Sequence, residues 1–135
     1  YDLKHGQCLV HGDAHQANLY FSGEGNPGYL DWATVMQSHW AFDVAPFLIC
    51  AQSVEERQLR EKEQLAFYLE ALRSHDVSAP NFDEAWLAYR QHAMWIFMFA
   101  CCPTEMHPEA ICSRNTERVC NAIADLETLQ ALESC

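Results

Sequence analysis

The feature that most constrains the fold is a run of turn-forming residues at positions 22–27, S-G-E-G-N-P. It lies between two short runs rich in apolar residues, at 19–21 and 28–30, so the segment predicts a β-hairpin. Asn18 precedes the first strand and Asp31 follows the second. Because neighbouring strands lie ~4.8 Å apart, an antiparallel hairpin brings these two ends together. An amide and a carboxylate at the same end of a hairpin could share a metal ion.

The loop before this hairpin, residues 11–18, reads H-G-D-A-H-Q-A-N and follows an apolar strand candidate at residues 7–10. In protein kinases, the aspartate of a D-x-x-x-x-N loop accepts the proton of the attacking hydroxyl. The asparagine of that loop and a later aspartate hold the magnesium ions on ATP. Asp13, Asn18 and Asp31 have this order and spacing. The D-x-x-x-x-N spacing alone is weak, but together with the hairpin and the L-D-W segment it predicts phosphoryl transfer.

Residues 10–19 and 29–32 resemble the aminoglycoside phosphotransferase and choline kinase group of kinase-like enzymes, whose catalytic loop reads H-G-D-x-x-x-x-N and whose metal aspartate lies in an I-D-W type segment. The F-D-V-A segment at 42–45 also fits this pattern. The resemblance implies that residues 1–135 are the C-terminal, catalytic lobe of a protein-kinase-like fold, with the N-terminal ATP-gripping lobe absent from the chain. Residues 43–48 and 84–90 look most like the ecdysteroid kinase-like branch.

The resemblance also implies the roles of single residues. Asp13 would be the catalytic base that orients the acceptor hydroxyl, and Asn18 and Asp31 would bind the magnesium that bridges the phosphates of ATP. Tyr20 would lie near the floor of the adenine site. The implied cofactors are therefore ATP and Mg²⁺, and the implied partner is a small-molecule hydroxyl substrate. Three further residues would support the loop structurally: His11, Gly12 and Asp43.

After Trp32 the pattern becomes helical, so the predicted fold class is α+β and mainly α, a short hairpin with the catalytic loop followed by about four helices. The first helix covers residues 43–51, with Pro46 in its first turn, where proline is tolerated. The second follows an N-cap at Ser53 and ends near residue 74. The third begins at a cap, Asn81 or Asp83, and continues to about Cys101, and the fourth covers residues 108–132.

Composition limits the partners. The net charge of −11 argues against nucleic acid, which requires a basic surface. It would suit a cationic acceptor, although solubility is the simpler explanation. The longest apolar stretches, 44–51 and 93–102, are too short to span a bilayer. Seven scattered cysteines fit neither a zinc spacing nor a disulfide framework, so we expect a reducing, cytoplasmic environment.

The chain also departs from the kinase pattern. A kinase requires a glycine-rich loop over the phosphates, a strand lysine and a helix glutamate, and none can be located in the sequence. One G-x-G-x-x-G does occur, at residues 23–28, but it falls in the predicted hairpin turn. We therefore expect the isolated chain to be inactive. It is either a fragment of a longer enzyme or a non-catalytic, pseudokinase-like lobe.

A metal-dependent hydrolase is the alternative hypothesis. His11, Asp13 and His15 alternate along the chain and could ligate zinc or manganese, with Asp31 or His39 completing the site. Gly12 and the turn-prone loop argue against one straight strand through all three ligands. Two further questions stay open: whether His15 assists the site or is solvated, and whether Trp32 and Trp40 line an acceptor pocket or the core.

Overall fold

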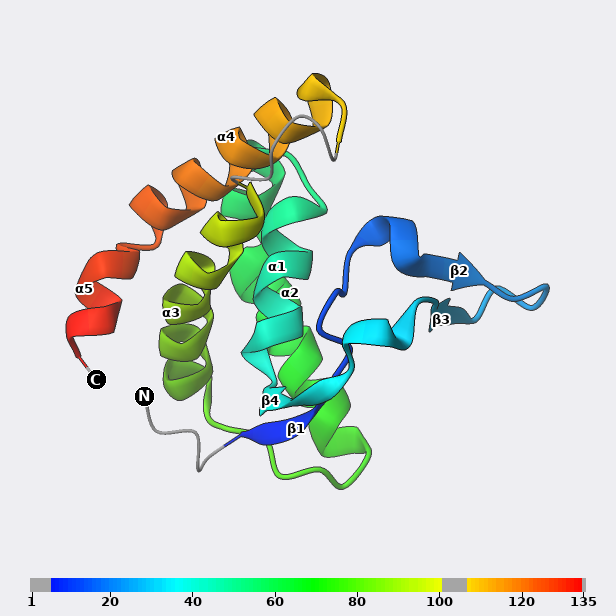
Figure 1. The fold of residues 1–135 in the computed structure, drawn as a ribbon. Coiled ribbons are helices and arrows are strands. Elements are labelled where there is room, and N and C mark those ends of the chain that lie inside the picture. Colours follow the sequence, from blue (N-terminus) through cyan, green and yellow to red (C-terminus); the bar gives the residue numbers. More distant parts are fainter. Residues whose placement is uncertain (1–5, 101–106, 135) are drawn as a thin grey trace.

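A computed structural model describes residues 6–100 and 107–134, and within these ranges it shows five α-helices and two two-stranded antiparallel sheets (Figure 1). The α+β, mainly α prediction is therefore confirmed. The strands and 3-10 helices are β1 (Gln7–Val10), η1 (Gln16–Asn18), β2 (Leu19–Phe21), β3 (Pro27–Tyr29), η2 (Trp32–Thr34) and β4 (Met36–His39). The α-helices are α1 (Ala41–Cys50), α2 (Val54–Ser74), α3 (Phe82–Ala100), α4 (Glu109–Asp125) and α5 (Thr128–Glu133).

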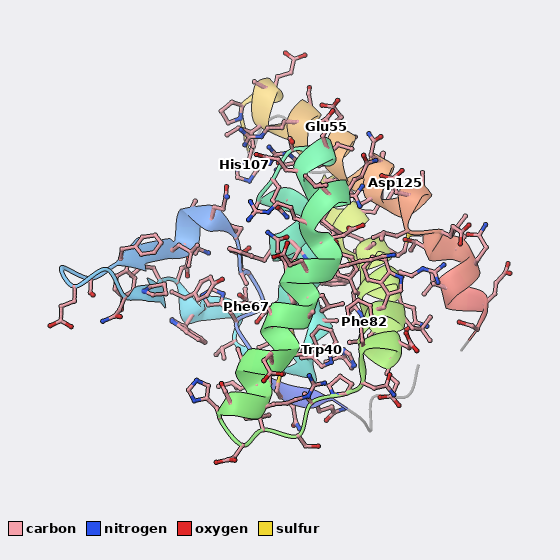
Figure 2. The ribbon with its side chains drawn as sticks, turned by 180° about the vertical axis from the view of Figure 1, so that it is seen from behind. Trp40, Glu55, Phe67, Phe82, His107 and Asp125 are labelled. Carbon is pink, nitrogen blue, oxygen red and sulfur yellow. The ribbon has the colours of Figure 1, made fainter. Side chains whose placement is uncertain are left out.

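The predicted hairpin forms from β2 and β3, with Leu19 opposite Tyr29, and its second strand begins one residue earlier than expected. Its turn closes through hydrogen bonds from Ser22 N–H to Asn26 O (2.9 Å) and from Gly25 N–H to Ser22 O (2.9 Å). Gly25 has a φ of +83°, a conformation that glycine adopts without steric cost. The hairpin projects away from the helices in both opposite views (Figures 1 and 2).

The pairing of β1 with β4 was not predicted from the sequence. The two strands are antiparallel, with Val10 opposite Met36 and Gln7 opposite His39. Residues 11–18 form the loop that we call the catalytic loop, after its predicted role. Because this loop leaves β1 after Val10 and β4 begins just after η2, the pairing places the loop beside η2. The β1–β4 ribbon thus holds the two ends of the catalytic segment together.

Helix α1 begins at Ala41, two residues before the predicted start, so Pro46 lies in its second turn and not in its first. Proline has no N–H, so the carbonyl of Phe42 receives no helical hydrogen bond from position 46. The helix is nevertheless central: Ala41, Ala45 and Ile49 are buried. It lies against α2 and α3, with α2 covering it from behind (Figures 1 and 2).

The second and third helices begin with the same local device. Ser53 Oγ accepts from Glu56 N–H (3.2 Å), and Glu56 Oε2 accepts from Ser53 N–H (3.0 Å). Asn81 and Glu84 form the same reciprocal pair, with both distances 3.0 Å. Such capping boxes satisfy backbone donors that a helix start leaves unpaired. The cap of α3 is therefore Asn81 rather than Asp83, and α2 ends at Ser74 as predicted. Cys101, the predicted end of α3, lies outside the described residues.

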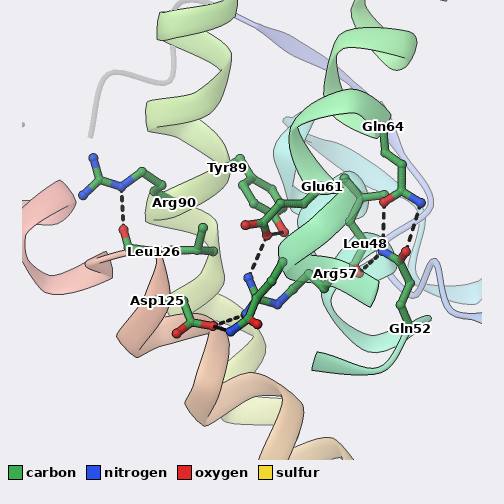
Figure 3. Close-up of polar contacts among 10 residues, drawn as sticks. Leu48, Gln52, Arg57, Glu61, Gln64, Tyr89, Arg90, Asp125 and Leu126 are labelled. Carbon is green, nitrogen blue, oxygen red and sulfur yellow. Dashed lines mark hydrogen bonds and ion pairs between the residues drawn. The ribbon is translucent and has the colours of Figure 1, made fainter. Parts of the chain in front are cut away.

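The predicted last helix, residues 108–132, is wrong as a single element. Helix α4 ends at Asp125, Glu127 adopts a left-handed φ of +47°, and α5 begins at Thr128. The side chain of Arg90 in α3 donates to the carbonyl of Leu126, which fixes the chain at the break (Figure 3). Beyond the break, Thr128 and Ala131 of α5 are buried, and α5 lies against α3.

The core lies among the helices, and beside it runs a polar network, which we call the Arg57 network: the buried residues Arg57, Glu61 and Tyr89 and the exposed residue Asp125 (Figure 3). Arg57 Nη1 lies 2.7 Å from Glu61 Oε2, and its Nη2 pairs with Asp125. Tyr89 Oη donates to Glu61 Oε2 (2.9 Å). Burial raises the pKa of the Tyr89 hydroxyl, and the Glu61 carboxylate raises it further. The network joins α2, α3 and α4.

Among the described residues, no helix has the length and apolar character needed to cross a membrane.

Candidate active site

The loop between β1 and η1 begins with His11, which is buried at 4% exposure. Its ring nitrogens both have partners: Nε2 lies 2.7 Å from Leu30 O, and Nδ1 accepts from Asp13 N–H at 3.3 Å. The rings of Tyr29 and Trp32 lie against it, with centroids 5.1 Å and 4.6 Å away. His11 therefore links the catalytic loop to the end of the hairpin, which is the kind of contact its predicted supporting role requires.

Gly12 allows the closest approach in the site. Its φ is +84°, and a Cβ at this position would lie 2.3 Å from the carbonyl oxygen of Thr34. Both the backbone conformation and the space exclude a larger residue. Thr34 also donates from Oγ1 to His11 O (3.0 Å). The catalytic loop is thereby fixed against η2, the turn that follows Asp31.

Asp43, in the first turn of α1, holds the same loop from the other side. Its Oδ2 accepts from His11 N–H at 2.6 Å, and its Oδ1 accepts from Gly12 N–H at 2.9 Å. One carboxylate thus satisfies two successive backbone donors of a tight loop, and charged acceptors form the stronger hydrogen bonds. The other end of α1 contributes as well, because Gln16 Nε2 donates to Ala51 O (2.8 Å).

Asp13 and Asn18, the predicted base and metal ligand, are in contact. Asn18 Nδ2 donates to Asp13 Oδ2 (3.2 Å) and to the backbone oxygen of Asp13 (3.0 Å). Both interactions use the amide nitrogen, whereas a magnesium ligand must be the amide oxygen. The two residues therefore can act together: the nitrogen of Asn18 orients Asp13, and its oxygen is available to a metal ion. The Asp13 carboxylate is 41% exposed, which leaves it accessible to a substrate.

Asp31 follows β3 and lies at the same end of the hairpin as Asn18, because Leu30 N–H donates to Asn18 O (2.8 Å). Its φ of 55° and ψ of 64° are left-handed, which is uncommon for a residue other than glycine, although aspartate tolerates it. Unusual backbone conformations often occur at functional sites. The carboxylate and amide oxygens of Asp31 and Asn18 are hard ligands that suit magnesium.

Tyr20, the predicted adenine-site residue, is 46% exposed on β2. It pairs with Gly28, and its ring lies directly over that glycine, where a Cβ would meet the ring at 2.5 Å. Gly28 therefore makes room for the aromatic face.

Of the residues of the hydrolase hypothesis, Asp13 and His15 lie close together, with His15 Nε2 3.4 Å from Asp13 Oδ2, but the full ligand set does not gather around one point. Both ring nitrogens of His11 are engaged, as described above. His39 pairs with Gln7, at the opposite end of the β1–β4 ribbon from the loop, and its ring stacks on His92 of α3 (4.9 Å). Within residues 6–100 and 107–134, no three His, Cys, Asp or Glu side chains are grouped to hold a metal ion.

A cavity of about 720 Å³ lies behind the catalytic loop, between β1, α1 and α2. His11 and Ala14 contribute to its wall, and Phe67 of α2 lines it as well. Trp32 and Trp40 both line this cavity, yet they differ in burial: Trp40 is 5% exposed and belongs to the core, whereas Trp32 is 50% exposed. Figure 2 labels Trp40 and Phe67 in the view from behind.

Three contacts of the site were missed by sequence reasoning: the bonds made by Gln16, Thr34 and the carbonyl of Leu30. Gln16 lies within the H-G-D-x-x-x-x-N motif, which is the signal in the sequence that marks it. Thr34 and Leu30 act through contacts that depend on how the segment folds, and no local pattern marks them.

Comparison with known proteins identifies the family of this chain. A family model, that of the phosphotransferase enzyme family, matches residues 3–88, which is more than half of the chain and includes the catalytic loop, the hairpin and α1. The chain belongs to this family of phosphotransferase enzymes. A search of curated proteins gave no match, and neither did a search of solved structures.

Proposed function

We propose that this chain carries the base and the metal ligands of an ATP-dependent kinase that phosphorylates a hydroxyl group of a small molecule. The observation that carries the proposal is the contact between Asp13 Oδ2 and Asn18 Nδ2, at the end of the hairpin that Asp31 also borders. The family match to phosphotransferases supports it. The proposal thus rests on one arrangement of Asp13, Asn18 and Asp31, and ATP and Mg²⁺ are the cofactors that the proposed reaction requires.

In this mechanism Asp13 orients the acceptor hydroxyl and accepts its proton as the phosphoryl group is transferred. Asn18 holds the Asp13 carboxylate through its amide nitrogen. Magnesium, when bound, neutralises the charge that develops on the phosphates, and the oxygens of Asn18 and Asp31 are the atoms that would hold it. Phosphoryl transfer depends mainly on such positioning and charge neutralisation, so a rigid loop is the main contribution of this chain.

The proposal includes a second lobe that covers ATP, because the sequence contains no lysine-bearing strand or glycine-rich loop placed before the catalytic loop. The acidic surface, with a net charge of −11, favours a cationic acceptor such as an amino sugar or a choline-like alcohol. Because the proposed reaction requires this second lobe, activity is to be measured in the protein as its natural gene encodes it.

The test is phosphate transfer from ATP to a panel of amino sugars, amino alcohols and sterols. The Asp13→Ala variant should lose activity by about 10²–10⁴-fold in kcat, the usual contribution of a general base, with a KM for ATP close to that of the wild type. Wild-type turnover in this variant would refute the proposal.

A matched pair of substitutions tests the metal ligand. Asp31 and Asp76 both adopt a left-handed φ, 55° and 58°, and asparagine tolerates this conformation equally well. Asp31→Asn should raise the magnesium concentration required for turnover, whereas Asp76→Asn, on an exposed turn, should not. An equal magnesium requirement in the two variants would exclude Asp31 as a ligand.

A further inference from the structure

His15 lies at the centre of the catalytic loop, between the base and the metal ligand. Its backbone N–H donates to Asp13 O (2.9 Å), and its carbonyl accepts from Asn18 N–H (3.0 Å). The main chain of His15 is therefore bonded to both residues on which the proposed chemistry depends. The family motif H-G-D-x-x-x-x-N leaves position 15 unspecified, and the proposed mechanism assigns no role to His15.

The side chain of His15 has a defined orientation. Its Nδ1 accepts from Ala17 N–H (3.2 Å) and so caps the 3-10 helix η1. Since Nδ1 is an acceptor, the neutral ring must carry its proton on Nε2. That nitrogen lies 3.4 Å from Asp13 Oδ2. The backbone of η1 thus selects the tautomer that presents an N–H to the catalytic carboxylate.

Two side-chain nitrogens then lie near the same oxygen of Asp13, and one of them, that of Asn18, already donates a hydrogen bond to it. Asn18 Nδ2 lies 3.2 Å from Oδ2, and His15 Nε2 lies 3.4 Å from it. Within the described part of the chain, no donor is bonded to the other oxygen, Oδ1. A carboxylate that is held through Oδ2 presents Oδ1 to the substrate. His15 and Asn18 together therefore determine which oxygen of Asp13 faces the acceptor.

Resting on the proposed function, we propose that His15 is a positioning residue for Asp13: its Nε2–H holds Oδ2 so that Oδ1 faces the acceptor hydroxyl. The proton of the hydroxyl passes to Oδ1, while His15 keeps its own proton. At 3.4 Å the two atoms are close but do not form a hydrogen bond in this structure, and catalytic contacts that are long or poorly aligned in a free enzyme commonly tighten when substrate binds. A base oriented by a third group is a recurring arrangement in enzymes.

Two substitutions separate this role from simple helix capping. In His15→Asn, the short side chain retains an oxygen that caps Ala17 N–H but does not reach Asp13. In His15→Gln, the longer side chain places an amide N–H near the position of Nε2, without an acceptor at the position of Nδ1. If His15 acts only as a cap, the asparagine variant is the better enzyme; if it positions Asp13, the glutamine variant is.

The measurement is ADP release from MgATP by the natural gene product, with water as the acceptor. His15→Asn should lower kcat by about 10–100-fold, the typical effect of losing an orienting partner, and leave the KM for ATP unchanged within about twofold. His15→Gln should recover most of that loss. Wild-type kcat in His15→Asn, with activity lost in Asp13→Ala, would overturn the role of His15 and leave the proposed function standing. Unchanged turnover in Asp13→Ala would instead refute the proposed function.

A second measurement does not depend on turnover. A long-range ¹H–¹⁵N spectrum of the ¹⁵N-labelled chain reports the tautomer of each histidine. We expect His15 to be in the Nε2–H form, and we expect its ¹⁵N shifts to change in Asp13→Asn. An Nδ1–H tautomer, or shifts that do not respond to Asp13→Asn, would overturn the proposal.

Discussion

The catalytic half of the molecule, residues 6–39, and its helical half are held by different interactions. In residues 6–39 only Val10, His11 and Ala14 are buried. The helical half, by contrast, contains most of the buried apolar side chains and the Arg57 network. The catalytic half therefore has too little core of its own to fix a geometry.

Hydrogen bonds to the helical half replace that missing core. Asp43 at one end of α1 accepts from two backbone N–H groups of the loop, and the carbonyl of Ala51, just beyond the other end, accepts from Gln16. Helix α1 thus belongs to the core and to the site together. The difference between the halves teaches that substitutions in the helices should change stability, whereas those in the loop should change activity more than stability.

The largest stability effect is expected in the Arg57 network. Glu61→Gln removes a charge that Arg57, at 1% exposure, meets at 2.7 Å. Arg57 keeps Asp125 as a second partner, so we expect the lower end of the penalty for breaking a buried ion pair, about 3 kcal/mol in the free energy of unfolding. Urea unfolding measures this, with Glu63→Gln on the exposed face of α2 as the control, expected within about 0.5 kcal/mol of the wild type. Equal effects would mean that the network contributes little.

Two glycines with the same backbone conformation test the loop. Gly12 and Gly25 have φ of +84° and +83°, but a Cβ would strike the carbonyl of Thr34 only at Gly12 and would meet nothing within 4 Å at Gly25. Gly25→Ala should cost about 1 kcal/mol for the backbone strain alone. Gly12→Ala should cost about 3 kcal/mol, because overpacking adds to the strain, and it should abolish transfer. Similar unfolding midpoints for the two variants would contradict the close contact with η2.

The elements that the sequence predicted are those with a local cause. The turn residues at 22–27 define the hairpin, and the S-x-x-E pattern beginning at Ser53 defines the start of α2. Strand β4 was missed because its M-Q-S-H sequence has no β pattern of its own, and it forms only as the partner of β1. The break at Glu127 was missed because an apolar period continues through it, while Arg90 fixes the turn from another helix.

The contacts of the site likewise divide into local ones and ones that depend on distant parts of the chain. The contact between Asp13 and Asn18 joins residues five apart in one loop, so the D-x-x-x-x-N spacing already assigned both residues to the site, although it did not predict their hydrogen bond. The bonds from Thr34 to His11 and from Gln16 to Ala51 span 23 and 35 residues. Such contacts depend on the β1–β4 pairing and on the place of α1, and neither is encoded in a short motif.

Asp43→Asn tests whether α1 holds the loop. The substitution keeps the size of the side chain, but it turns one of two acceptors into a donor that faces a backbone N–H. Losing a charged hydrogen bond costs about 1.5–3 kcal/mol. We expect unfolding to become easier by about 2 kcal/mol and transfer to fall by at least tenfold, since the loop is no longer fixed. Asp83→Asn, exposed in the first turn of α3, is the control and should change neither quantity. Full activity in Asp43→Asn would show that the loop holds its geometry without α1.

The last expected effect, on stability alone, concerns the junction of the two halves, where His39 of β4 stacks on His92 of α3 at 4.9 Å. Burial is the main cause that lowers the pKa of His92 to about 4; the hydrogen bond with the Ala88 carbonyl opposes this shift, and the neighbouring His39 adds a smaller lowering effect. In the unfolded chain a histidine has a pKa of about 6.5. The unfolded state therefore binds a proton that the folded state rejects, so stability is complete above about pH 6.5 and is lost as the pH falls toward 4.

Between about pH 7.5 and 5 the loss in the free energy of unfolding should be about 2 kcal/mol. His92→Gln should remove that part of the pH dependence in urea titrations, and an unchanged slope would contradict it. Because the pair joins β4 to α3, hydrogen exchange at low pH should rise first in β1 and β4, which would place the weaker interface between the two halves rather than within the helices.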